Sequence, residues 1–115
     1  MKKAGDVVIF EFPQTDFSRR KLRPALLICQ MSSLYDDWLL CMISSQLQSF
    51  TEGVDELMRA SDSDFTQSGL IRESIIRVTR IAVVDGSILS GKIGEIDQLR
   101  LKRIKENLAA WITAR

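Results

Sequence analysis

Histidine is absent from this sequence of 115 residues. Without an imidazole group, the chain has no Ser-His-Asp triad, no Cys-His nucleophile, no ribonuclease mechanism based on two histidines and no zinc site with histidine ligands. Only two cysteines are present, Cys29 and Cys41, so a zinc site of four thiolates is excluded as well. Any catalysis therefore depends on arginine, lysine, carboxylate or hydroxyl groups, or on a metal ion held by oxygen atoms.

Excess charge and long apolar runs are also missing. Sixteen basic and fifteen acidic residues give a formal charge of +1, so a nucleic-acid partner must be held by a local basic patch. No apolar run approaches the roughly 20 residues that span a bilayer. Met1-Lys2-Lys3 leads directly into Ala4-Gly5-Asp6, without the apolar core of a signal peptide. Together with cysteines expected to stay reduced, these features predict a cytoplasmic protein that does not bind membranes.

The length predicts a single domain over residues 1–115. Runs of β-branched and apolar residues predict strands, and Pro13 is expected to end the first of them. Asp85-Gly86 predicts a hairpin between the last two strands. Arg77 and Arg80 interrupt the apolar face of the longest one. The expected strands are residues 5–12, 23–29, 38–43, 54–58, 74–84 and 88–93.

One amphipathic helix is expected after the strands, with Asp97 as its N-cap. Its apolar residues recur at helical spacing and are Leu101, Ile104, Leu108, Trp111 and Ile112. The opposite face carries Arg100, Lys102, Arg103, Lys105 and Glu106. The pattern favours a mainly β fold: a small, strongly bent barrel of five to seven strands with a C-terminal helix packed against it.

A polar loop expected over residues 13–21 ends in a basic cluster, and Arg23 follows at the start of the next strand. Pro24 fixes the backbone directly after Arg23, so this guanidinium is held more rigidly than one at a loop tip. Guanidinium groups bind two phosphate oxygens at once. The alternatives are a solvated loop that only aids solubility, and an Arg23 side chain paired with a carboxylate such as Asp6 or Glu11.

A second polar loop begins where the third strand ends, at Ser44 and Ser45. A hydroxyl group at the mouth of a barrel can bind a phosphate oxygen, although serine without a base is a poor nucleophile. Serines in this position also form turns. Gln46 and Gln48 alternate beyond them and either contact a base edge or face water.

A bound metal ion is not expected. The acidic pairs Asp36-Asp37 and Asp62-x-Asp64 lack the spacing of a calcium loop. Cys29 and Cys41 are expected as a reduced, buried pair on neighbouring strands. The sequence thus predicts neither a metal nor another cofactor.

The whole series of segments resembles the MazF/PemK-like toxins of bacterial type II toxin–antitoxin systems. The resemblance spans nearly the whole chain in the expected order and rests on GDVVIFEFP, TD, KLRPALLI, ISSQLQ, SGLIRESIIRVTRIAVVD and LSGKIGEID. It implies an SH3-like barrel of the kind found in the gyrase poison CcdB, and a homodimer. It also implies metal-independent, sequence-specific cleavage of single-stranded RNA such as mRNA, and inhibition by a cognate antitoxin.

The resemblance further implies roles for individual residues. Arg23 matches the arginine of the family's Arg-Pro pair, and Ser44 stands where the family more often has threonine; in the family both serve the scissile phosphate. The 2′-hydroxyl of RNA acts as nucleophile, so the products carry 2′,3′-cyclic phosphate and 5′-hydroxyl ends and DNA is inert. Because the guanidinium pKa exceeds about 12, stabilisation of charge by Arg23 is favoured over base catalysis. RNA binding is expected of Asp16, Phe17, Arg19, Arg20, Lys21, Ser45, Gln46 and Gln48.

One departure from the family pattern lies at Ala82 and Val83, where family members often carry a basic residue and a hydroxyl residue. This departure and the serine at position 44 keep open the alternative of a catalytically degenerate family member. A second alternative is a CcdB-like protein that uses the same barrel to bind and poison gyrase without cutting nucleic acid. Replacement of Arg23 by alanine separates the nuclease from the gyrase poison, because only the nuclease needs this side chain.

Overall fold

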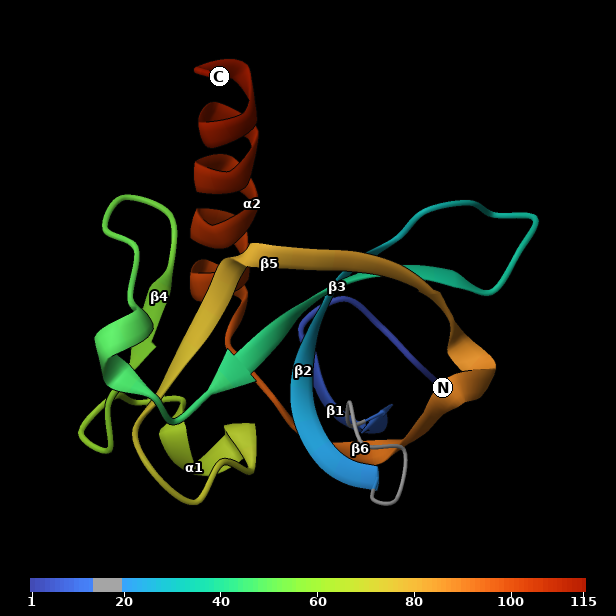
Figure 1. Cartoon of the computed structure of the whole chain (residues 1–115), viewed down its shortest axis with the longest axis horizontal. Helices are drawn as coiled ribbons and strands as arrows, with labels where there is room; N and C mark the ends of the chain where they lie inside the picture. Colours follow the sequence, from blue (N-terminus) through green and yellow to red (C-terminus); the bar gives the residue numbers. More distant parts are fainter. Residues whose placement is uncertain (14–19) are drawn as a thin grey trace.

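The computed structural model describes residues 1–13 and 20–115, and the side chains of residues 1–10 and 22–115. In this part of the chain six strands form one antiparallel sheet in the order β4-β5-β3-β2-β1-β6 (Figure 1). The strands are β1 (Asp6–Pro13), β2 (Arg20–Gln30), β3 (Asp37–Ser44), β4 (Glu56–Met58), β5 (Ser74–Asp85) and β6 (Leu89–Glu95). The helical elements are η1 (Leu47–Ser49), α1 (Phe65–Ser68), η2 (Gly86–Ile88) and α2 (Gln98–Thr113). The mainly β fold with a C-terminal helix is confirmed.

Both faces of the central strands β1, β2 and β3 are largely buried, which explains why these strands contain nearly continuous apolar runs. Consecutive residues alternate between two clusters, so Val7 and Leu26 belong to one and Val8 and Leu27 to the other. The first cluster includes Leu101, Ile104 and Leu108 of α2. The second contains only strand residues, namely Val8, Phe10, Ala25, Leu27, Trp38 and Leu40. The helix therefore covers one face, and the coiling of the sheet covers the other.

Strand β5 bends sharply at its middle, as Figure 1 shows. Its register against β3 jumps from Cys41↔Ile81 to Met42↔Arg77. Inside the bend, the backbone N–H and the hydroxyl of Thr79 donate to Asp55 Oδ1 over 3.1 and 3.2 Å. Asp55 is buried, so its carboxylate supplies the acceptor that the β3 ladder does not provide at this point.

The connection from β4 to β5 brings α1 directly against β6, at the edge of the sheet opposite β4. A Cβ atom on Gly94 would lie 2.2 Å from the carbonyl oxygen of Gln67, and one on Gly69 would lie 2.1 Å from that of Ile93. Gly69 also adopts φ +76°, where glycine is favoured. The sheet is thus closed toward a barrel by backbone contact with a single helical turn.

The hairpin predicted at Asp85-Gly86 is wrong. Strand β6 pairs with β1, at the far side of the sheet from β5. Asp85 instead caps η2, since its Oδ1 accepts from the backbone N–H of Ser87 over 2.9 Å. Gly86 lies close to Asp36, because a Cβ there would lie 2.3 Å from Asp36 Oδ2 and that side chain would have to shift. Asp85 and Gly86 therefore form the start of η2, which packs against the turn between β2 and β3.

The start of the second strand and one short helix also differ from expectation. Strand β2 begins at Arg20 rather than near residue 23, and Pro24 lies inside it, opposite Ile9 of β1. The proline is tolerated because the ladder between β2 and β3 begins only at Ala25. The single turn α1 lies between the expected strands 54–58 and 74–84, where no helix was expected.

Helix α2 begins as predicted, with the backbone N–H of Arg100 donating to Asp97 Oδ1 over 2.8 Å. The placement of Arg100 on the polar face is wrong, because this side chain is only 8% exposed. Its nitrogens donate to Asp64, Glu56 and Asp62 over 2.9, 2.9 and 3.0 Å. Arg103 adds a second ion pair to Glu56. The pair Asp62-x-Asp64 therefore anchors α2 to the connection between β4 and β5.

Both cysteines are free. Cys41 is buried, and burial raises the pKa of its thiol, which keeps it in the unreactive protonated form. Cys29 is half-buried, so the expectation of a fully buried pair holds for Cys41 alone. The two residues lie on paired strands but not opposite one another, because Cys41 faces Leu26 and Cys29 faces Leu39.

Candidate phosphate-binding site

Arg23 and Ser44 come together at the end of the ladder between β2 and β3. This ladder pairs Leu26 with Cys41 and Ala25 with Met42. Extending its register by two residues places Arg23 directly opposite Ser44, on the same face of the sheet. The two side chains also line the same cavities. Two residues singled out separately from the sequence therefore form one constellation.

The hydroxyl group of Ser44 is oriented by the chain that follows it. Its oxygen accepts a hydrogen bond from the backbone N–H of Gln46 over 3.0 Å, in the local turn that serines form after strands. Because the oxygen is engaged as an acceptor, the hydroxyl proton is left to donate to another group. Ser44 thus presents a donor at the last position of β3.

Two cavities meet at these residues. The small cavity has a volume of about 230 Å³ and is lined by Arg23, Met42, Ile43, Ser44, Arg77 and Arg80. The large cavity has a volume of about 600 Å³ and is lined by Leu22, Arg23, Pro24, Ile43, Ser44, Ser45, Gln46, Leu70, Ile71, Arg72 and Ser74. Arg23, Ile43 and Ser44 belong to both, so they form the wall between the two.

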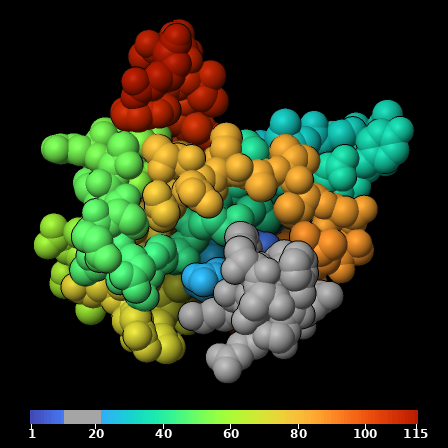
Figure 2. All heavy atoms as spheres, viewed as in Figure 1, coloured from blue at the N-terminus to red at the C-terminus, as the bar shows by residue number. Residues whose placement is uncertain are grey.

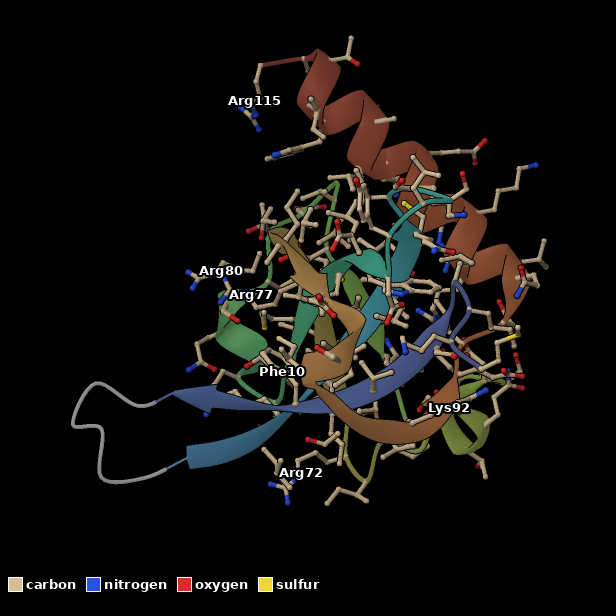
Figure 3. All side chains as sticks on the ribbon, turned by 90° about the vertical axis from the view of Figure 1, so that its right-hand side faces the viewer. Phe10, Arg72, Arg77, Arg80, Lys92 and Arg115 are labelled. Carbon is tan, nitrogen blue, oxygen red and sulfur yellow. The ribbon has the colours of Figure 1, made fainter. Side chains whose placement is uncertain are left out.

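The lining of the small cavity is rich in guanidinium groups. Arg77 pairs with Met42 across β3 and β5, and its Nε atom is buried without a hydrogen-bond partner among the described residues. Figure 3 shows Arg77 and Arg80 close together at one side of the molecule. The residues that the structure assigns to this lining include three arginines and no carboxylate. A buried, unsatisfied donor in such a setting is ready to bind a phosphate oxygen.

Sequence reasoning missed Arg72, Arg77 and Arg80 as residues of the site. Regular alternation along a strand places residues 77 and 80 on opposite faces, so their spacing carried no signal. The bend in β5 removes that alternation and brings both side chains to the small cavity. Arg72 precedes β5 and lines the large cavity, so four arginines surround the two cavities although the net charge is only +1.

Among the residues expected to bind RNA, Ser45 and Gln46 line the large cavity. Gln48 lines neither of the two cavities, and its side chain donates to Gln46 Oε1 over 2.9 Å. Arg20 and Lys21 belong to β2, opposite Pro13 and Phe12, and their side chains are outside the described ones. Asp16, Phe17 and Arg19 lie outside the described residues.

Ala82 and Val83, the departures from the family pattern, lie beyond the bend in β5 and line neither cavity. In the described part of the chain, His, Cys, Asp and Glu side chains form no group of three that could hold a metal ion. Within the same residues, no helix is both long and apolar enough to span a bilayer.

Fold and cavities together describe a small β protein with an arginine-lined cavity at the end of the ladder between β2 and β3. The architecture is similar to a solved structure titled as an endoribonuclease in complex with its cognate antitoxin from a mycobacterial species. The two structures superimpose with a TM-score of 0.68 at 14% sequence identity, over 100% of this chain and 98% of the other. This similarity concerns the fold.

No curated protein sequence is matched by this chain. Residues 3–112 match the family described as the PemK-like, MazF-like toxin of type II toxin-antitoxin system. The chain therefore belongs to this toxin family, as its sequence segments indicated.

Proposed function

We propose that this protein is an endoribonuclease toxin that cleaves single-stranded RNA at the wall between the two cavities. One observation carries the proposal: Arg23 and Ser44 line both cavities, and the small cavity also holds Arg77, whose buried Nε has no hydrogen-bond partner among the described residues. Membership of the toxin family supports a role in a toxin–antitoxin system. No metal ion takes part in the proposed reaction.

The reaction uses the nucleophile that RNA itself carries. The 2′-hydroxyl oxygen forms a bond to the adjacent phosphorus, and the bond from phosphorus to the 5′-oxygen of the next nucleotide breaks. The 2′-hydroxyl proton passes to solvent, and the leaving oxygen takes up a proton. The products are a 2′,3′-cyclic phosphate and a 5′-hydroxyl end.

The protein stabilises the charge that builds up on the non-bridging oxygens during attack. Arg23 and Arg77 supply paired N–H donors from two strands, and Ser44 adds an O–H donor. Donors of this kind, aimed at developing charge, are worth about 10²- to 10³-fold in rate each. Among the described residues that line the cavities there is no carboxylate, so the proposal assigns these side chains electrostatic stabilisation rather than proton removal.

The test is incubation of the purified protein with single-stranded RNA of mixed sequence in excess EDTA, beside the Arg23→Ala variant. We expect discrete cuts with cyclic-phosphate ends and a loss of at least about 10²-fold in Arg23→Ala. Arg23→Lys keeps the charge but loses the planar guanidinium group, so its cleavage rate is expected to lie between the rates of the wild-type protein and Arg23→Ala. Arg59→Ala, which removes an exposed arginine outside both cavities, serves as the matched control.

Intact RNA in the presence of folded protein would contradict the proposal. It would move the assignment to gyrase poisoning or to a catalytically degenerate toxin, and a DNA-supercoiling assay would decide between them. DNA of the same sequence is expected to stay intact under all conditions, because it lacks the 2′-hydroxyl group.

The proposal includes a cognate antitoxin and a homodimer. Apolar side chains stay exposed in the single chain, with Ile81 and Val83 of β5 at 41% and 55% and Ile112 of α2 at 59%. Figure 2 shows that the last turns of α2 stand clear of the rest of the molecule. A second copy is the proposed cover for these surfaces. Sedimentation at micromolar concentration tests this, and a monomer would count against it.

A further inference from the structure

We infer that the large cavity binds one nucleobase next to the scissile phosphate, with Leu22 and Ile71 as its apolar walls and Gln46 as the group that contacts the base edge. The inference rests on the proposed function, because it assigns a substrate subsite to the same centre. It names residues that determine which RNA sequence is cut.

The two cavities differ in the chemistry of their linings. The small cavity is dominated by guanidinium groups. The large cavity, about 600 Å³ in volume, combines apolar side chains with hydroxyl and amide groups, and its volume is typical of small-molecule sites. A nucleobase has two apolar faces and one polar edge, so it requires this mixture, whereas a phosphate does not.

The apolar walls come from two separate segments. Leu22 lies on β2 and is 55% exposed, and Ile71 lies on the connection from α1 to β5 and is 85% exposed. An apolar side chain at the edge of a cavity gains by covering a flat ring, because both surfaces leave water. Ile43 and Ser74 also line this cavity, and both are buried.

The polar edge of the cavity is held in place before any ligand arrives. Gln46 Oε1 accepts from Gln48 Nε2, and the backbone N–H of Gln46 donates to Ser44 Oγ. The side-chain N–H groups of Gln46 remain as donors and fit a carbonyl oxygen or ring nitrogen of a base. One turn orients both Ser44 and Gln46. The group that contacts the base and the group that stabilises charge on the phosphate are therefore held at a fixed position relative to each other.

Arg72 completes the large cavity with a cation for the phosphate of the bound nucleotide. In Figure 3, Arg72 and the pair Arg77 and Arg80 lie at different sides of the ribbons of β1 and β2. Arg23 lies in the wall between the two cavities. The RNA backbone therefore crosses from one cavity to the other at Arg23, where the cut occurs.

The experiment is sequencing of all cut ends produced from a random-sequence RNA by the wild-type protein and by Ile71→Ser, Leu22→Ser and Gln46→Leu. We expect Ile71→Ser and Leu22→Ser to lower base discrimination at one position beside the cut by about 10-fold, with a larger change in KM than in kcat. Gln46→Leu changes which base is preferred there. Ile71→Phe restores discrimination, because an aromatic ring stacks on a base.

Leu99→Ser is the matched control, since Leu99 is 77% exposed on α2 and lines neither cavity. A second readout is binding of an RNA with a 2′-deoxy sugar at the cut site, which cannot be cleaved. Its affinity is expected to fall about 10-fold in Ile71→Ser and to be retained in Ile71→Phe.

The outcomes separate the two proposals. If the wild-type protein cuts no RNA, the proposed function fails. If the wild-type protein cuts while the variants keep the same base frequencies at every position and the same affinity for uncleavable RNA, the base pocket is refuted and the nuclease stands.

Discussion

Arginine serves two opposite purposes in two regions of this molecule. At the start of α2, Arg100 is 8% exposed and donates to three carboxylates, those of Glu56, Asp62 and Asp64. At the bend of β5, Arg77 faces a cavity with no carboxylate among its described lining residues and keeps a buried Nε without a partner. The difference lies in the partners that the fold supplies, not in the side chain.

This contrast shows how a chain with almost no net charge can gather arginine side chains around two cavities. The carboxylates of residues 56–64 are occupied by Arg100 and Arg103, and no carboxylate is among the described residues that line the two cavities. A satisfied arginine stabilises the fold, whereas an unsatisfied one lowers stability and is available to a ligand. Sites that break the rule of satisfied polar groups are the ones expected to be functional.

The largest effect is expected when the satisfied arginine is removed. Arg100→Ala leaves buried carboxylates unpaired, so the free energy of unfolding should fall by about 3–5 kcal/mol. Urea unfolding at neutral pH measures this, and Lys102→Ala, on the exposed face of the same helix, should change it by less than about 0.5 kcal/mol. Equal effects of the two variants would show that the ion pairs do not anchor α2.

The reverse outcome is expected for the unsatisfied arginine. Arg77→Met keeps the length of the side chain but removes the charge and the buried Nε. Cleavage should fall by about 10²- to 10³-fold while the free energy of unfolding stays the same or rises. Rate assays measure the fall in cleavage, and urea unfolding of the same preparation measures the free energy of unfolding. A strong loss of stability would place Arg77 with Arg100 instead of in the site.

The pH dependence of stability distinguishes the two regions next. Burial alone raises the pKa of Asp64, but hydrogen bonds from the Arg100 side chain and the Asp97 backbone outweigh it and hold that pKa below its ordinary value of 3.8. A carboxyl whose pKa is lower in the folded state contributes stability that is complete above the unfolded-state pKa and lost as the pH falls through the folded-state pKa.

Asp64→Asn should therefore flatten the decline in the free energy of unfolding below about pH 4. Urea unfolding from pH 7 to pH 2.5 measures this. Glu106→Gln removes an exposed carboxylate from the same helix and is the control. An unchanged acid decline in Asp64→Asn would mean that the ion pairs with Arg100 do not set acid stability.

The smallest effect concerns salt. Each phosphate that an arginine neutralises on a single strand adds about 0.7 to the slope of log affinity against log salt concentration. Arg80→Gln should lower that slope by about 0.7 for an RNA that cannot be cleaved. Arg103→Gln should leave it unchanged, because Arg103 is paired with Glu56 away from the cavities. Equal slopes for both variants would remove Arg80 from the RNA path.

Much of the fold could be predicted from local patterns. The β-branched runs predicted the strands, Asp97 predicted the start of α2, and Leu101, Ile104 and Leu108 predicted its buried face. These signals depend on backbone propensity and on side-chain spacing within one element. Asp85-Gly86 failed because a turn signal says that the chain turns, but the partner of the next strand is chosen by packing across the whole sheet.

The sequence by itself determined the elements and the two residues that stand at special chain positions: Arg23 before a proline and Ser44 at a strand end. Only the tertiary structure decided which arginines are satisfied. The partners of Arg100 lie 36 to 44 residues away along the chain, and the cavity around Arg77 requires the register of β3 and the bend of β5. Composition cannot encode such pairings, because they depend on which distant segments the packing of the core brings into contact.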